Sequence, residues 1–205
     1  MSTPSVTRRE QRTVDSRARI LEAAVECLIE GGFSGATTLA IQARSGVSRG
    51  RLLHHFPSRE ALLVAAAEHL AGQRVRQATE RISTHVARAA TPEARIAQVV
   101  ESMWLTFHEP HFWAAVELWT AARTNTGIAD ALLPGERKLG GVIRASVDRM
   151  WGSELVAHPR YPQLRELLLT SMRGVALTYS FDRRDPRRDS HIALWVETAR
   201  VILES

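Results

Sequence analysis

Residues Thr37 to His55 read TTLAIQARSGVSRGRLLHH, and this stretch decides the fold. It predicts two short helices joined by a tight turn. Thr37 and Thr38 offer side-chain oxygens that cap the start of the first helix. Gly46 ends that helix, because glycine takes the left-handed conformation without a Cβ clash. Ser48 caps the second helix. The stretch is therefore a helix–turn–helix.

The first turn of the second helix carries Arg49, Gly50 and Arg51, at the end where backbone N–H groups and the positive dipole end point outward. A helix–turn–helix with an arginine-rich leading turn fits the major groove of double-stranded DNA. Arginine pairs with guanine through two hydrogen bonds. The two arginines lie about 200° apart around the helix, so we expect one to read a base and the other to contact a phosphate. Arg51 is the expected base reader.

The distribution of charge supports this interpretation. The net charge is +5, and no Asp or Glu occurs between Glu30 and Glu60. The arginines inside this window are Arg44, Arg49, Arg51 and Arg59. A local surplus of positive charge is typical of a surface that faces phosphates. The plainer alternative is a solvated face, but solvated helices usually mix both signs.

Composition excludes several classes of protein. The chain has 205 residues, of which 44% are hydrophobic, as in globular proteins. No apolar run reaches the roughly 18 residues that cross a bilayer, and the polar N-terminal segment lacks the apolar core of an export signal. The single cysteine, Cys27, excludes an internal disulfide framework and is expected as a buried, inert thiol. We expect a cytoplasmic protein with no membrane partner.

Helical periodicity continues along the whole chain, so the predicted fold is all-α. The expected helices cover about 16–30, 91–107, 110–123, 162–181 and 190–203, besides the two of the helix–turn–helix. A fourth helix is expected to open at Ser58, carry Leu62 to Leu70 on one face and emerge from the small domain through the polar stretch 73–81. We expect Pro134 to interrupt or kink a further helical segment and 152–162 to be a loop. The predicted domains are a flexible basic tail (1–14), a helix–turn–helix DNA-binding domain (15–72) and a larger helical effector-binding and dimerisation domain (73–205).

The first third of the chain contains five short segments in a characteristic order and spacing: Ile20–Ala24, Gly31–Phe33, Thr37–Thr38, Ser45–Ser48 and His54–Leu63. In these segments it resembles the DNA-binding domain of TetR-family transcriptional regulators. The resemblance implies that Thr37 and Thr38 cap a helix and contact phosphate, and that His54, His55 and Arg59 contact the DNA backbone. Leu53 departs from the family pattern, which most often has a phosphate-contacting tyrosine there.

The full set of predicted DNA-binding residues combines the motif, the arginine window and the resemblance. It comprises Thr37, Thr38, Arg44, Ser48, Arg49, Gly50, Arg51, His54, His55 and Arg59. Because one short helix binds DNA weakly, we expect two copies to read a palindromic operator.

Dimerisation follows mainly from the resemblance, and two apolar stripes on the last long helices are the candidate interface. Their residues are Leu168, Met172, Val175, Tyr179, Trp195, Ala199 and Ile202. The alternative is that these stripes face the core of the chain itself.

Aromatic and histidine side chains gather in the middle of the chain, where the resemblance implies a small-molecule effector. The candidate effector-binding residues are Met103, Trp104, Phe107, His108, His111, Phe112, Trp119 and Trp151. Apolar walls with a few polar groups are typical of ligand pockets, although aromatics at helical spacing are equally well explained as core. A metal site on His108, His111 and Glu117 is disfavoured, since Pro110 disrupts the helix that would align the histidines.

These observations predict a ligand-responsive DNA-binding regulator, a repressor released from its operator by a small hydrophobic or aromatic effector. No nucleophile motif or phosphate-binding glycine loop appears, so we expect no enzymatic activity, metal or cofactor. The alternative is a helical small-molecule-binding or sequestering protein whose operator binding is weak or lost.

Overall fold

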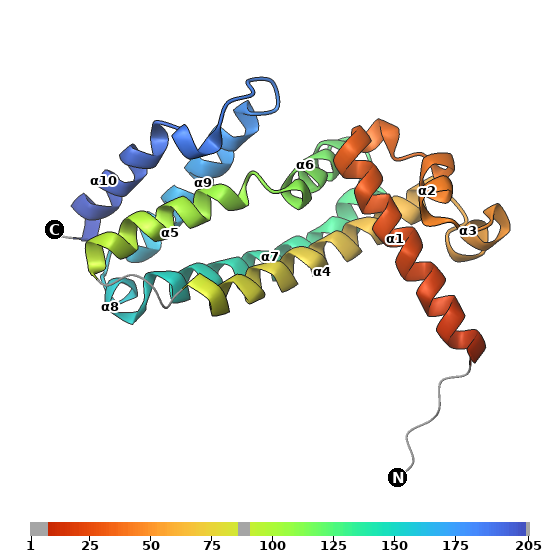
Figure 1. Cartoon of the computed structure of the whole chain (residues 1–205), viewed down its shortest axis with the longest axis horizontal. Coiled ribbons are helices and arrows are strands. Elements are labelled where there is room, and N and C mark those ends of the chain that lie inside the picture. Colours follow the sequence, from red (N-terminus) through yellow and green to blue (C-terminus); the bar gives the residue numbers. More distant parts are fainter. Residues whose placement is uncertain (1–7, 86–90, 204–205) are drawn as a thin grey trace, which may run out of the picture. The chain divides into compact units, whose positions relative to one another are not determined.

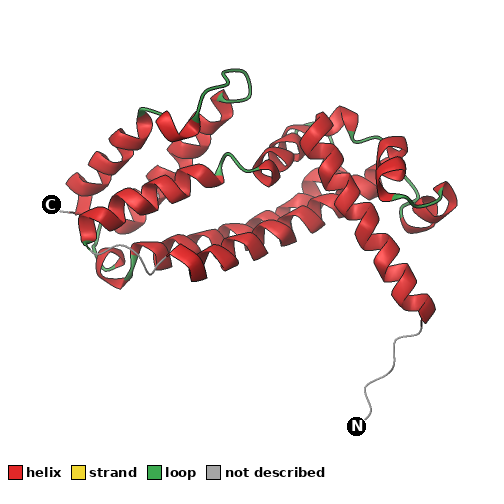
Figure 2. Cartoon of the chain, viewed as in Figure 1, coloured by secondary structure: helices red, strands yellow, loops and turns green. Residues whose placement is uncertain are grey.

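The computed structural model describes residues 8–85 and 91–203, and within them every regular element is helical (Figures 1 and 2). The α-helices are α1 (Arg8–Gly35), α2 (Thr38–Ser45), α3 (Arg49–His55), α4 (Arg59–His85), α5 (Pro92–Thr106), α6 (Pro110–Ala122), α7 (Thr126–Trp151), α8 (Ser153–Val156), α9 (Tyr161–Thr178) and α10 (His191–Leu203), with the short 3₁₀ helix η1 at Pro186–Arg188. The all-α prediction is confirmed. Among the described helices, none is both long and apolar enough to cross a membrane.

The chain forms two compact units. The first unit contains the described residues up to Gln73 together with Trp113–Arg137, and the second contains Arg74–Phe112 and the residues from Lys138 onward. Helices α4, α6 and α7 each contribute residues to both units. The first unit thus includes a segment, 113–137, that the sequence analysis assigned to the effector domain.

The helix–turn–helix forms as the motif predicts. The Thr37 hydroxyl accepts a hydrogen bond from the Ala40 N–H at 3.1 Å, and Gly46 ends α2 with φ 67°. The Ser48 hydroxyl accepts the Arg51 N–H at 3.3 Å at the start of α3. Both caps satisfy N–H groups that a helix start otherwise leaves without partners.

Helix α1 is longer than the periodicity predicts. It begins at Arg8, so residues 8–14, expected as part of a flexible tail, are helical; residues 1–7 of that tail lie outside the described part. The sequence of this extension, Arg-Arg-Glu-Gln-Arg, consists of strong helix formers. At the other end the helix does not stop at Gly31 but runs to Gly35 across a bend at Gly32, whose φ of 64° favours glycine.

The core of the first unit is built by α1, α4, α6 and the start of α7, with α2 and α3 held against it. Ile41 of α2 and Leu52 of α3 are the buried anchors of the helix–turn–helix. Cys27 lies in the same core and is 6% exposed, and burial raises the pKa of its thiol. The predicted burial of this cysteine is confirmed.

The second unit packs α5, α9 and α10 against one another, with η1 against α5 and α8 against α9. The helices of this unit differ from the sequence-based expectations at two places. One helix, α7, continues through Pro134 without a break; this residue is exposed, so water can reach the carbonyl left without an N–H partner. The expected loop at 152–162 contains the one-turn helix α8 and the start of α9.

Candidate functional site

The leading turn of α3 is open to solvent. Arg49, Gly50 and Arg51 are all exposed, whereas Leu52 next to them is 2% exposed and anchors the helix. Among the described residues, no hydrogen bond or ion pair engages the guanidinium of Arg49 or Arg51. A Cβ added to Gly50 would meet no atom within 4 Å. The described part of the chain therefore leaves these two guanidinium groups and the open side of Gly50 without an internal contact.

The two histidines at the end of α3 have different surroundings. His54 is exposed, but the Nε2 atom of His55 lies 2.9 Å from the hydroxyl of the fully buried Ser16 in α1. The Ser16 hydroxyl donates to the Thr13 carbonyl at 2.9 Å, so it accepts from the Nε2–H of His55. Burial, followed by the positive charges of neighbouring residues, lowers the pKa of His55. His55 therefore holds α3 against α1 through its hydrogen bond to Ser16.

Arg59, expected as a phosphate contact, is engaged within the first unit. Its Nε donates to the Ala36 carbonyl at 3.1 Å, and its Nη2 donates to the Phe33 carbonyl. The guanidinium also lies 4.6 Å from the centre of the Phe33 ring. These contacts hold the turn between α1 and α2, which sets the start of the helix–turn–helix.

A second contact holds the same turn from α6. The Glu117 carboxylate accepts the Phe33 N–H at 2.7 Å, and a Cβ on Gly32 would lie 2.9 Å from its Oε2. Gly32 therefore supplies both the left-handed backbone and the space for this carboxylate. The sequence analysis considered Glu117 only as a possible metal ligand; among the described residues no cluster of three metal-ligating side chains occurs.

Arg44 is paired inside the first unit as well. Its guanidinium makes a two-pronged contact with Glu30 and lies 3.3 Å from Glu26. Hydrogen bonding to Arg44 lowers the pKa of Glu30. Both glutamates precede the acid-free window in sequence, but α1 carries them next to α2. The positive charge available on the surface is therefore smaller than the window predicts.

Two leucines near the motif are exposed. Leu53 of α3, which stands where the family most often has tyrosine, is 45% exposed, and Leu39 of α2 is 73% exposed. Thr38 is half-buried at the first position of α2. The groups that remain open for DNA on the described surface are thus concentrated on α3.

The second unit contains a cavity of about 330 Å³. Its buried apolar wall is formed by Met103, Phe107, Phe112, Leu139 and Val147. The rings of Phe107 and Phe112 meet edge to face with their centres 5.3 Å apart. The Gln77 amide and the His111 Nδ1, 3.3 Å apart, add a polar pair. The volume lies at the lower end of the range found for small-molecule sites.

Half of the predicted effector residues line this cavity: Met103, Phe107, His111 and Phe112. The other four, Trp104, His108, Trp119 and Trp151, do not. Trp119 packs on the core of the first unit, and Trp151 is buried against Tyr161 with ring centres 5.9 Å apart. For these residues the explanation as core applies.

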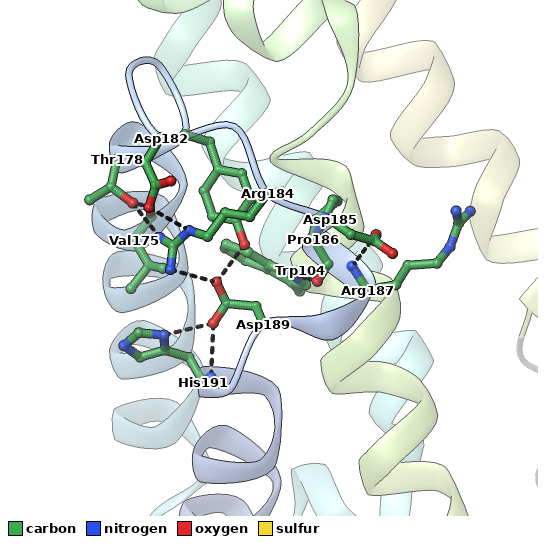
Figure 3. A network of polar contacts seen from close by, with 11 residues as sticks. Trp104, Val175, Thr178, Asp182, Arg184, Asp185, Pro186, Arg187, Asp189 and His191 are labelled. Carbon is green, nitrogen blue, oxygen red and sulfur yellow. Dashed lines mark hydrogen bonds and ion pairs between the residues drawn. The ribbon is translucent and has the colours of Figure 1, made fainter.

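Trp104 and His108 belong to one packed aromatic cluster, and Figure 3 shows Trp104 beside the loop before α10. The fully buried Trp104 donates its Nε1–H to the Pro186 carbonyl at 2.7 Å, and its ring centre lies 4.9 Å from that of Trp195. The His108 ring packs on Trp104 and Tyr179. Burial lowers the pKa of His108, so the neutral ring is favoured.

Asp189 organises that loop. Its carboxylate accepts hydrogen bonds from the Tyr179 hydroxyl at 2.5 Å, the His191 N–H at 2.8 Å and the His191 Nδ1 at 2.7 Å (Figure 3). Burial alone would raise the pKa of Asp189, but these hydrogen bonds hold it below its usual value. The network fixes the start of α10, and none of Tyr179, Asp189 and His191 lines the cavity.

Most residues of the predicted dimer stripes lie inside the chain. Leu168, Met172, Trp195 and Ala199 are at most 3% exposed, and the Trp195 Nε1–H donates to the Ser171 hydroxyl at 3.0 Å. The remaining three, Val175, Tyr179 and Ile202, are half-buried. These stripes form the core between α5, α9 and α10, which is the alternative that the sequence left open.

The sequence analysis missed most residues of the cavity. Fifteen further residues line it, from α4, α5, α7, α9 and the turn before α6, and their charged members are Arg74, Glu109, Arg144, Glu166 and Arg173. No motif marks them, because each is an ordinary polar residue on a long helix. These residues form a site only because the fold brings their helices together.

Comparison with known proteins agrees with the motif. Residues 20–66 match the family model described as bacterial regulatory proteins, tetR family. The chain is 28% identical over 171 residues to the HTH-type transcriptional regulator CymR of Pseudomonas putida, covering 82% of this chain and 80% of that regulator. It is 30% identical over 135 residues to the HTH-type transcriptional repressor AcnR of Corynebacterium diphtheriae, covering 65% and 64% respectively.

A solved structure extends the similarity of the fold to the whole chain. Salmonella enterica GusR superposes with a TM-score of 0.64 at 23% identity, covering 98% of this chain and 100% of that one. At this identity the likeness concerns the fold. Residues 20–66 thus match the DNA-binding domain of the tetR family, and the chain as a whole is similar to HTH-type transcriptional regulators in sequence and to GusR in fold.

Proposed function

We propose that the chain is a dimeric repressor that binds a palindromic operator through α3 and is released from it by a small molecule bound in the cavity of the second unit. The observation that carries this proposal is the leading turn of α3. Two arginines and a glycine are exposed there directly after the Ser48 cap that fixes the start of the helix, and no hydrogen bond or ion pair within the described residues engages either guanidinium. Arginines presented on a short rigid helix suit guanine edges and phosphates in the major groove.

The proposed dimer interface differs from the stripes expected from sequence. On α9, Leu167, Thr170, Gly174 and Leu177 are all exposed at helical spacing. A Cβ at Gly174 would meet nothing within 4 Å, so a partner helix can approach closely there. On α10, Leu194 and Val201 are 58% and 59% exposed, two turns apart. Exposed apolar side chains in such an array favour a contact with a second copy.

The cavity supports the ligand-responsive part of the proposal. It has an apolar wall, several polar groups and a volume suited to a small organic molecule. Helix α6 contributes His111 and Phe112 to the cavity and Glu117 to the turn before α2. A change at the first two residues can thus alter the support of the helix–turn–helix through one continuous helix.

Selection of bound sequences from a random duplex pool by the purified chain tests the proposal. We expect enrichment of an inverted repeat whose half-sites are centred about 34–36 Å apart, or a multiple of the helical turn. Footprinting on the enriched sequence then defines the contacted positions. Recovery of a single half-site, or of no sequence, would contradict the palindromic operator.

One observation favours the alternative of weak operator binding. Three of the predicted DNA contacts, Arg44, His55 and Arg59, are engaged within the first unit, and Leu53 replaces the family's usual tyrosine. Under this alternative the chain binds small molecules in the cavity but shows only salt-sensitive, sequence-independent DNA binding. The same selection experiment separates the two functions.

A further inference from the structure

The charged residues around the cavity in the second unit carry information about its ligand. Three arginines line it from three helices, Arg74 of α4, Arg144 of α7 and Arg173 of α9, against two glutamates, Glu109 and Glu166. Positive charge therefore exceeds negative charge by one among the charged lining side chains. A surplus of positive charge at a largely apolar cavity favours a ligand that carries a negative charge.

Arg144 is the arginine best placed to supply that charge. Among the described residues, no hydrogen bond or ion pair engages its guanidinium. Its Nη1 lies 3.5 Å from the position that a Cβ would occupy on Gly140, which also lines the cavity. The guanidinium of this exposed arginine thus lies beside Gly140 on the lining of the cavity. Its donors are available for a bound oxyanion.

The neutral polar groups of the cavity are poor donors by comparison. The hydroxyl of Thr106 donates to the Met103 carbonyl at 2.7 Å, and that of Ser146 to the Val142 carbonyl at 2.7 Å. The Thr170 hydroxyl likewise donates to the Glu166 carbonyl at 2.7 Å. These hydroxyls have their protons committed to backbone and can only accept. The groups of the cavity that can donate a hydrogen bond to a ligand are therefore the arginines and the Gln77–His111 pair.

We infer that the cavity takes a small amphipathic organic acid, an aromatic or aliphatic body with one carboxylate. The body lies against Phe107, Phe112 and Leu139, and the carboxylate contacts Arg144, with Arg173 close by on the cavity lining. The inference deepens the proposed function, since it names the chemical class of the effector. A fully ionised acid suits this site because the guanidinium stays charged at all physiological pH values.

Titration calorimetry with matched ligand triads tests the inference on the full-length protein. Each triad keeps the apolar body and changes only the charge: phenylacetate, 4-phenylbutyrate and decanoate, each with its neutral amide and the corresponding primary amine. We expect the carboxylate of at least one triad to bind about tenfold or more tightly than its amide, and the amine to bind most weakly. Equal or tighter binding of the amide or amine would overturn the inference, and so would the absence of measurable binding by every carboxylate.

Substitution of one arginine identifies the contact. Arg144→Gln should remove most of the preference for carboxylate over amide, and the double variant with Arg173→Gln should remove the rest. Arg149→Gln is the matched control, because Arg149 is an exposed arginine of the same helix that does not line the cavity. A carboxylate preference that survives the double variant would place the anion elsewhere and contradict the inference.

A parallel gel-shift assay separates the inference from the proposed function. If a carboxylate binds in a manner that depends on Arg144 but does not release DNA, the ligand-responsive function fails while the ligand class stands. If DNA is released by an amine or a neutral compound instead, the ligand class fails while the function stands.

Discussion

The first unit concentrates its exposed recognition chemistry on one seven-residue helix, whereas the second unit assembles its cavity from five helices. In α3, the arginines are exposed to solvent, while Leu52 and His55 hold the helix against the rest of the unit. In the cavity, the same side chains that would contact a ligand also form the core, as Phe107, Phe112 and Leu139 do. The difference teaches that DNA contacts can be changed without loss of fold, while the apolar wall of the cavity cannot.

The largest expected effect separates core from interface in the second unit. Trp195→Asp places a carboxylate among buried aromatic rings, and we expect a loss of roughly 4 kcal/mol or more in the free energy of unfolding, enough to disrupt this unit. Leu194→Asp changes a neighbouring residue that is 58% exposed. It should keep the fold and shift the protein from dimer to monomer.

Thermal unfolding and analytical ultracentrifugation of both variants distinguish these outcomes. If Trp195→Asp gave a folded monomer, Trp195 would lie in the dimer interface, as the sequence analysis expected. A Leu194→Asp variant that remains a full dimer would remove α10 from the proposed contact.

The next effect distinguishes two arginines of the first unit. Arg51→Ala should weaken operator binding about 10- to 100-fold, corresponding to about 1–3 kcal/mol for a lost base contact, with unchanged thermal stability. Arg59→Ala should instead lower the free energy of unfolding by about 1–3 kcal/mol, since it leaves the Phe33 and Ala36 carbonyls without their donor.

Fluorescence anisotropy with labelled operator and urea unfolding give the two readouts. If Arg59→Ala weakened DNA binding without lowering the free energy of unfolding, Arg59 would contact DNA directly. The assignment of Arg59 to the packing of the first unit would then be wrong.

The features that could be predicted from the sequence are those that depend on neighbouring residues. The caps at Thr37 and Ser48 and the stop at Gly46 were predictable because each depends on a few neighbouring residues. The pairing of Arg44 with Glu26 and Glu30, and of His55 with Ser16, was not, because these contacts join residues of different helices. In the cavity, Met103 and Phe112 were marked by the aromatic cluster, but Arg144 and Arg173 had no local signal.

A smaller effect is expected at Gly50. Gly50→Ala replaces a residue with poor helix propensity in α3, and the added Cβ meets no atom of the chain. The free energy of unfolding should therefore rise by up to about 1 kcal/mol. Operator affinity should fall nonetheless, by about tenfold, if the backbone at this position approaches the DNA closely. Unchanged affinity in the anisotropy assay would show that this position faces away from the groove.

The smallest expected effect is a dependence of stability on pH through His55. Its pKa is lowered in the folded state, mainly by burial, so below about pH 6.5 the unfolded chain binds a proton that the folded chain does not. The stability due to the neutral ring is thus fully present at higher pH. It is lost as pH falls through the unfolded pKa towards the folded one.

Urea unfolding of the wild-type chain and His55→Gln at pH values of about 7.5 and 5.5 measures this effect. The glutamine amide still donates to Ser16 but does not titrate, so the variant should lose less stability on acidification. An identical loss in both proteins would assign the pH dependence to other groups.

The position of Cys27 gives the first unit a built-in reporter. It is the single cysteine of the chain, and burial both shields its thiol and disfavours the reactive thiolate. Alkylation by a thiol reagent must therefore wait until the core around α1 opens. The labelling rate of the natural protein reports the opening of the DNA-binding unit alone, with no engineered probe. Measured with and without operator or ligand, that rate reveals whether occupation of either site tightens or loosens this core.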